Sequence, residues 1–201
     1  MALLPTTLTQ STFDQYYAHT QSKQIIITMP SPQKTKGKGY ENAVAKFLTE
    51  TYNNKFMRVP TSGAYLGGIN YDRRSLMTEG QVRAFKGDII PPDDWNFFNC
   101  ECKFYKAFNF HQLYDGNKLL DGWITETLTT ANPKDLNIIF MKFNNIGEYV
   151  AYESKDGFEV DSFTQYNNNW HITSKSQFWH SHNIQLIKYK STGITTELHR
   201  K

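Results

Sequence analysis

Apolar residues recur along the chain at two spacings, and these spacings distinguish helices from strands. Apolar positions three or four residues apart predict an amphipathic helix over residues 39–53, with Glu41 in its first turn. A second helical pattern covers residues 119–128 and ends before Asn132-Pro133, because proline cannot continue a helix. These two segments are the predicted helices of the central part of the chain.

Shorter apolar or alternating runs bounded by turn-forming residues predict strands. The predicted strands cover residues 56–60, 85–90, 97–104, 138–143 and 148–152. The turn-rich segment 91–96 connects two of them, and Asn144-Asn-Ile-Gly147 predicts a hairpin between the last two. The end of the chain predicts further strand and a short helix near residues 177–182. This order indicates an α/β fold with a mixed central sheet flanked by helices.

The same pattern divides the chain into three parts. Residues 1–35 read as an irregular N-terminal arm rich in Thr, Ser and Gln, which ends in the breaker cluster MPSPQ. Residues 36–155 hold the regular elements and form the predicted core. Residues 156–201 are aromatic and mixed, and we interpret them as a C-terminal extension packed on that core.

Composition excludes several classes of protein. With 39% hydrophobic and 15% aromatic residues, the chain is too apolar for a disordered protein. No apolar run approaches the roughly 20 residues that span a bilayer, and the N-terminus lacks the pattern of a signal peptide. Cys100 and Cys102 lie one residue apart on a predicted strand, which suits neither a disulfide nor a zinc site. We therefore expect a cytoplasmic protein without a membrane partner.

Positive charge is concentrated in the first part of the chain. Residues 1–86 hold 11 Lys/Arg against 5 Asp/Glu, whereas residues 87–201 hold 11 against 14. Such asymmetry is typical of a protein with a polyanionic partner such as DNA, although ordinary solvated surface charge would give the same numbers.

The candidate chemistry lies on the strand over residues 97–104. Side chains alternate along a strand, so Glu101 and Lys103 share one face while Cys100 and Cys102 share the other. A hairpin to the preceding strand would bring Asp88 opposite Glu101. Two carboxylates so close repel each other unless a cation lies between them, and Mg²⁺ favours this kind of oxygen ligand. The alternative is a surface ion pair between Glu101 and Lys103, worth about 0–1 kcal/mol.

The motifs at these positions resemble a known superfamily. Gly87-Asp88-Ile89 and Cys100-Glu101-Cys102-Lys103 resemble the two halves of the PD-(D/E)XK nuclease signature, with Gly where that signature has Pro. The segment Lys36-Gly37-x-Gly39-x-Glu41 resembles the start of the archaeal-type Holliday junction resolvases. Arg58-x-x-x-Ser62-Gly63 is similar to an Arg and Ser-Gly segment of those enzymes. The resemblance covers roughly residues 34–152.

This resemblance implies a restriction-endonuclease-like core and a metal-dependent endonuclease that uses Mg²⁺, for which Mn²⁺ can substitute. It implies that Glu41, Asp88 and Glu101 bind the metal and that Lys103 and Ser62 complete the catalytic set. The implied substrate is branched DNA such as a four-way junction, cut by a homodimer with twofold symmetry. The residues expected to contact DNA are basic and precede the catalytic strands: Lys34, Lys36, Lys38, Arg58, Arg73, Arg74, Arg83 and Lys86.

Other interpretations stay open at this point. The same signature serves restriction-like endonucleases and exonucleases, and a DNA-binding module with a vestigial site would keep the same residues. His171, His180 and His182 are a weaker candidate for a metal site. Aromatic residues near both ends of the chain could stack on unpaired bases, but aromatic residues more often belong to the core.

Overall fold

The computed structural model describes residues 32–60, 75–154, 157–167 and 169–193, which belong to one compact unit, Pro32–Lys201. Its helices are α2 (Pro32–Tyr52), α3 (Glu79–Phe85), the short 3-10 helix η2 (Phe110–Leu113), α4 (Lys118–Thr130), α5 (Lys175–Phe178) and α6 (Ser181–Thr192). Its strands are β1 (Met57–Arg58), β2 (Ile89–Ile90), β3 (Phe98–Tyr105), β4 (Leu136–Phe143), β5 (Gly147–Glu153), β6 (Thr164–Tyr166) and β7 (Trp170–Ser174).

Most strands of the described unit form one mixed sheet in the order β3-β4-β5-β7-β6. Strands β3 and β4 run parallel and are connected through α4, whereas the remaining neighbours are antiparallel. Strands β1 and β2 pair with each other in a separate small sheet. The predicted hairpin of β4 and β5 is confirmed, with Asn145 and Gly147 at positive φ in its turn. The predicted α/β fold with helices flanking a mixed sheet is also confirmed.

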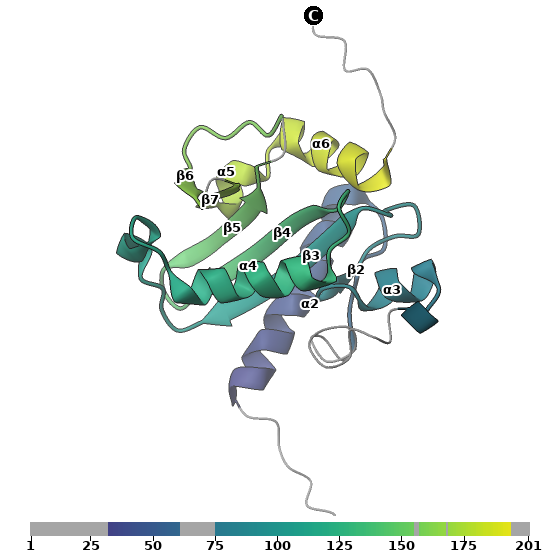
Figure 1. Ribbon diagram of the computed structural model, residues 1–201, viewed down its shortest axis with the longest axis horizontal. Coiled ribbons are helices and arrows are strands. Elements are labelled where there is room, and N and C mark those ends of the chain that lie inside the picture. The colour runs from purple at the N-terminus through teal and green to yellow at the C-terminus, as the bar shows by residue number, and fades with distance from the viewer. Residues whose placement is uncertain (1–31, 61–74, 155–156, 168, 194–201) are drawn as a thin grey trace, which may run out of the picture. The chain divides into compact units, whose positions relative to one another are not determined.

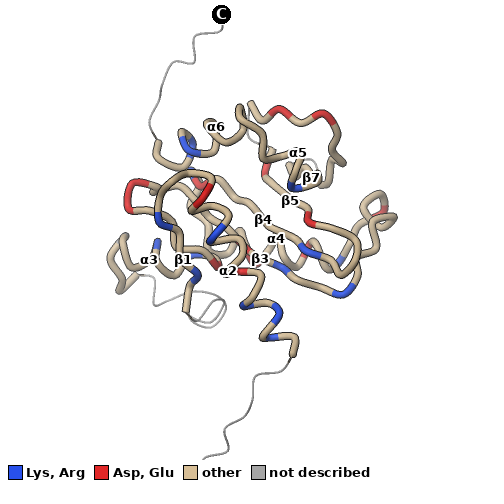
Figure 2. The backbone as a smooth tube through the Cα atoms, turned by 180° about the vertical axis from the view of Figure 1, so that it is seen from behind, with Lys and Arg blue, Asp and Glu red and all other residues tan. Residues whose placement is uncertain are grey.

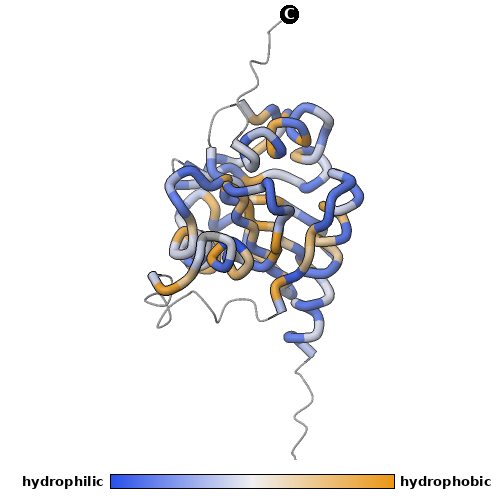
Figure 3. The backbone as a smooth tube through the Cα atoms, turned by 90° about the vertical axis from the view of Figure 1, so that its right-hand side faces the viewer, coloured by the Kyte–Doolittle hydropathy of each residue, from blue (hydrophilic) through white to orange (hydrophobic). Residues whose placement is uncertain are grey.

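Helices cover both faces of this sheet, with α4 on one side and α2 on the other (Figure 1). Along β4, Ile138 and Phe140 pack into the cluster below α2, while Ile139 and Met141 pack into the cluster below α4. Hydrophobic positions accordingly gather in the middle of the described unit (Figure 3). Polar side chains in the buried first half of β3, or in β4 before Lys142, are therefore in the interior and need a partner.

The first helix is longer than its apolar pattern predicts. Helix α2 begins at Pro32, so the basic stretch before Glu41 forms its first turns and Glu41 lies near its middle. Proline is tolerated at the first helical positions because its missing N–H has no partner there. The buried face of Tyr40, Val44 and Leu48 holds the rest of the helix on the sheet and outweighs the cost of its glycines.

The strand predicted over residues 85–90 is wrong for most of its length. Thr78 and Gln81 form a capping box that begins α3, and this helix continues to Phe85. Gly87 then adopts a left-handed conformation, so that only Ile89–Ile90 remains as strand.

The residues after 155 complete the sheet. Strand β7 pairs with β5, so the boundary expected between core and extension falls between two strands of the same sheet. Helices α5 and α6 pack against the α2 side of this sheet through Phe178 and Ile187. Within the described part of the chain, no helix has the length and apolar character that a membrane crossing requires.

Candidate active site

Gly87 sets the path of the segment that carries Asp88. Its φ is 67°, a conformation that favours glycine, and a Cβ added to it would lie 2.5 Å from the carbonyl oxygen of Cys100. The backbone can therefore pass directly beside β3 at this point. Proline, which the signature has at this position, cannot adopt a positive φ. The departure from the signature thus has a conformational reason.

Asp88 attaches to the free edge of β3 through two hydrogen bonds. Its backbone N–H donates to the Cys100 carbonyl at 2.8 Å, and its Oδ2 accepts from the Cys102 N–H at 2.9 Å. These two bonds lie on either side of Glu101 in the sequence. The structure therefore brings Asp88 beside Glu101, as expected, but through these bonds rather than through a regular hairpin.

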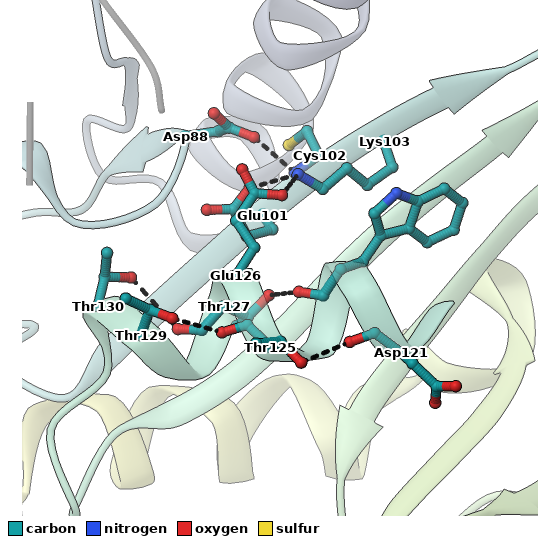
Figure 4. Close-up of polar contacts among 11 residues, drawn as sticks. Asp88, Glu101, Cys102, Lys103, Asp121, Thr125, Glu126, Thr127, Thr129 and Thr130 are labelled. Carbon is teal, nitrogen blue, oxygen red and sulfur yellow. Dashed lines mark hydrogen bonds and ion pairs between the residues drawn. The ribbon is translucent and has the colours of Figure 1, made fainter. Parts of the chain in front are cut away.

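Glu101 and Lys103 share the face of β3 that α4 covers (Figure 4). The Lys103 ammonium lies 3.1 Å from Oε2 of Glu101. Glu101 is only 5% exposed and Asp88 only 6%. The expected alternative, an ion pair on an open sheet face, does not describe this site, because two carboxylates and an ammonium are held together in the interior.

Burial determines the electrostatics of this group. It raises the pKa of Glu101, and the neighbouring Asp88 carboxylate raises it further, whereas Lys103 only partly offsets both effects. For Lys103, burial disfavours the ammonium, but the Glu101 and Glu126 carboxylates outweigh it and raise its pKa. Lys103 is therefore a cation at neutral pH. The carboxylate pair, in contrast, is poorly neutralised and favours binding of a proton or a metal cation.

Residues 32–197 match the model of a protein family described as "Phage putative PDDEXK endonuclease". The chain belongs to this family. The expected membership of the PD-(D/E)XK superfamily, and with it a nuclease with a restriction-endonuclease-like fold, is thereby confirmed. No curated protein and no solved structure matches the chain. The narrower resemblance to Holliday junction resolvases stays a prediction.

The donor set of this PDDEXK endonuclease fits a divalent cation. Mg²⁺ keeps several waters and takes one or two protein carboxylates, which Asp88 and Glu101 can supply. Burial and, after it, the Asp88 carboxylate raise the pKa of Glu101, and a bound cation would offset both effects by stabilising the charged form. Among the described residues, no group of three or more His, Cys, Asp or Glu side chains could hold a metal ion.

Glu41, the third expected metal ligand of this endonuclease, is buried and paired with Arg58. Its Oε2 lies 3.3 Å from Nη1 of Arg58. Arg58 is the last residue of β1, and the backbone N–H of Val59, which follows it, donates a hydrogen bond to the Asp88 carbonyl. The Glu41–Arg58 pair is therefore adjacent to the Asp88 segment, and metal binding by Glu41 stays a prediction.

The residues expected to contact DNA have different environments. Lys34, Lys36 and Lys38 are exposed on the first turns of α2. Figure 2 shows blue, basic positions along that part of the helix. Arg83 belongs to α3, and its guanidinium donates hydrogen bonds to the side-chain oxygens of Asp93 and Asn96. Ser62, Arg73 and Arg74 lie outside the described residues.

The structure corrects the expectation for Lys86. Its side chain is 2% exposed, and its ammonium lies 2.8 Å from Oδ2 of the equally buried Asp135. A buried charge needs such a partner, so Lys86 is part of the interior and does not form part of a DNA-binding surface.

Two residues of the site were not found from the sequence. Glu126 of α4 places its Oε2 2.6 Å from the Lys103 ammonium. Asn99 of β3 donates from Nδ2 to the Thr127 carbonyl at 2.9 Å, and thereby ties α4 to the strand. The alternation along β3 already put Asn99 on the face of Glu101, but the helix that covers this face could not be assigned from that pattern.

The cysteines and two of the histidines have ordinary structural surroundings. Cys100 and Cys102 are free thiols, and burial raises the pKa of both. His180 and His182 each contact a backbone carbonyl of the segment before β6 through Nε2, at 2.6 Å and 3.0 Å.

Proposed function

We propose that this nuclease is a divalent-metal-dependent endonuclease that hydrolyses DNA phosphodiester bonds, with Mg²⁺ as its metal and Mn²⁺ as a substitute. The observation that carries the proposal is the buried pair of Asp88 and Glu101 beside the Lys103 ammonium. The phage family of the chain favours action inside a phage-infected cell.

Each residue has a role that follows from its surroundings. Asp88 and Glu101 would hold the cation, and the Cys102 N–H, which donates to Oδ2 of Asp88 at 2.9 Å, fixes the orientation of that carboxylate. A bound divalent cation would polarise the scissile phosphate and lower the pKa of the attacking water, which favours formation of hydroxide. Lys103, already protonated, stabilises negative charge that develops on the phosphate and is poorly suited to act as a base.

The proposed substrate is branched DNA such as a four-way junction, cut by a homodimer. Two features support this narrower proposal: the lysines at the start of α2 are exposed, and the Glu41–Arg58 pair is buried next to the Asp88 segment. Two symmetric incisions require two active sites related by a twofold axis. Sedimentation equilibrium at several protein concentrations tests the dimer.

The experiment is cleavage of labelled four-way junction, linear duplex, flap and single-stranded DNA by the purified protein in Mg²⁺ or Mn²⁺. Symmetric cuts on the junction alone are the expected result. Cleavage of duplex at a fixed sequence would instead indicate a restriction-like enzyme, and degradation from ends an exonuclease. Absence of cleavage on every substrate in both metals would contradict the proposal and leave a DNA-binding module.

Variants of the carboxylate pair test the site itself. Asp88→Asn and Glu101→Gln should each reduce cleavage by at least about 100-fold, because each removes a charge that the cation requires. DNA binding, measured by fluorescence anisotropy in Ca²⁺, should change little. Cleavage at the wild-type rate by either variant would show that the site is elsewhere.

A further inference from the structure

The Lys103 ammonium is shared between carboxylates from two different elements. It lies 3.1 Å from Oε2 of Glu101 on its own strand and 2.6 Å from Oε2 of Glu126 on α4 (Figure 4). The Lys103 side chain is 12% exposed, whereas that of Glu126 is 50% exposed. The shorter contact is thus made to the residue at the solvent side of the site.

The position of Glu126 is fixed from the sheet. The neighbouring Thr127 carbonyl accepts from Nδ2 of Asn99, which is fully buried and also donates to Oδ1 of Asn137 on β4. One turn earlier, Trp123 packs against Tyr105 at the end of β3. Helix α4 is therefore anchored to β3 on both sides of Glu126, and the height of Glu126 above the strand is set by those contacts.

We propose that Glu126 is a positioning residue, which holds the Lys103 ammonium in place when Glu101 directs its charge to a bound cation. In the metal-free site Glu101 and Glu126 share the lysine. A cation held by Asp88 and Glu101 would compete with Lys103 for Glu101, and Glu126 would then remain as the carboxylate partner of Lys103. This inference rests on the proposed function, because it concerns the metal-bound site.

The geometry explains why such a partner is needed. A lysine side chain has four rotatable bonds and loses much of its conformational freedom when its ammonium is fixed. Without Glu126, the ammonium can turn toward the solvent side of the site. Misplacement of a catalytic group by about 1 Å can reduce a rate by about 100-fold. The role of Glu126 is therefore expected in kcat, with little effect on KM.

A cross-linking experiment tests the contact without any activity. A water-soluble carbodiimide joins a lysine to a contacting carboxylate as an amide, with loss of water to the reagent, and mass spectrometry identifies the joined peptides. In the metal-free wild type, we expect a Lys103–Glu126 link that Glu126→Gln abolishes. Glu50→Gln is the matched control, because Glu50 forms a surface pair with Lys46 at 3.7 Å and its loss should remove only that link.

The kinetic experiment compares the same variants on the best DNA substrate. Glu126→Gln should lower kcat by about 10- to 100-fold with KM nearly unchanged, and Glu126→Asp should restore part of the loss. The melting temperature should fall by no more than about 2–4 °C, because a half-exposed ion pair contributes little to folding. Glu50→Gln should retain the wild-type kcat.

The outcomes separate this inference from the proposed function. A wild-type kcat in Glu126→Gln, or absence of the Lys103–Glu126 link in the wild type, would overturn the inference while leaving the nuclease intact. An equal loss of kcat in Glu126→Gln and Glu126→Asp together with a large fall in melting temperature would overturn it in favour of a structural role. A wild type that cuts no DNA would overturn the proposed function, and the cross-link would still decide the contact.

Discussion

The backbone conformation of Gly87 determines where the Asp88 side chain lies. The positive φ and the close approach to the Cys100 carbonyl place Asp88 where its N–H and its carboxylate both bond to β3. The sequence identified Asp88 as a candidate but treated Gly87 only as a departure from the signature. The candidate side chain can thus be identified from the sequence, whereas the backbone geometry that positions it cannot.

Gly87→Ala should therefore damage both folding and activity. The alanine would have to adopt a left-handed backbone conformation, and its Cβ would lie 2.5 Å from the Cys100 carbonyl oxygen. Such strain costs about 1–3 kcal/mol, and its relief would move Asp88. Urea denaturation and the cleavage rate measure the two effects. Gly122→Ala is the control, because Gly122 is exposed on α4 and an added Cβ would have no atom within 4 Å, so this variant should be more stable by up to about 1 kcal/mol.

Glu101 predicts how the stability of the metal-free protein depends on pH. Burial and the Asp88 carboxylate raise its pKa to about 8, so the folded state binds a proton that the unfolded chain has already released. Its contribution to stability is present below the unfolded pKa of about 4.5 and is lost as the pH rises through about 8, by at most about 1.4 kcal/mol per pH unit.

Thermal denaturation between about pH 5 and about pH 9 in a chelator tests this dependence. We expect the melting temperature to fall across that range in the wild type, and Mg²⁺ to restore stability mainly at the alkaline end, where both carboxylates are charged. Glu101→Gln should lose this part of the pH dependence and of the Mg²⁺ effect. A variant profile identical to that of the wild type would show that Glu101 does not titrate in this range.

At the level of elements, the segment that carries Asp88 is held in place by contacts outside β3. Its N-terminal side is tied by the buried ion pair of Lys86 and Asp135, which connects the end of α3 to the turn before β4. The same Asp135 carboxylate accepts from the Asn132 N–H in that turn. The site therefore depends on the loop after α4 as well as on α4 itself.

Lys86→Met should be strongly destabilising, by about 3–5 kcal/mol, because it leaves the Asp135 carboxylate buried without its ammonium partner. Lys46→Met is the comparison, since its ion pair with Glu50 is exposed and its loss should cost less than about 1 kcal/mol. Chemical denaturation of the two variants measures the difference. Equal small effects would contradict the structural role given to Lys86.

For the molecule as a whole, the structure shows where part of the positive charge of the first half of the chain lies. The lysines of the basic stretch are exposed on the first turns of α2, whose later turns carry the buried Glu41. The helix thus has a basic, exposed start and a part that packs on the sheet next to the catalytic segment. This arrangement suits contact with a phosphate backbone beside the active site.

Replacement of Lys34, Lys36 and Lys38 by Gln should weaken DNA binding without changing the folded structure. If each lysine contacts one phosphate, the plot of log affinity against log salt concentration should become less steep by about 2.7 in total. Binding titrations at several salt concentrations with the Glu101→Gln background, which prevents cleavage, measure this slope. An unchanged slope would show that DNA approaches from another side.

The sequence by itself determined the strand that carries Glu101 and Lys103, the helix and hairpin that follow it, and the superfamily. These features depend on local alternation, on helical spacing and on short motifs, all of which are written in neighbouring residues. Only the tertiary structure decided that α4 covers this face and adds Glu126, that Glu41 pairs with Arg58, and that Lys86 is interior. Those outcomes depend on contacts between residues far apart in the chain, where burial and charge pairing determine the environment of each side chain.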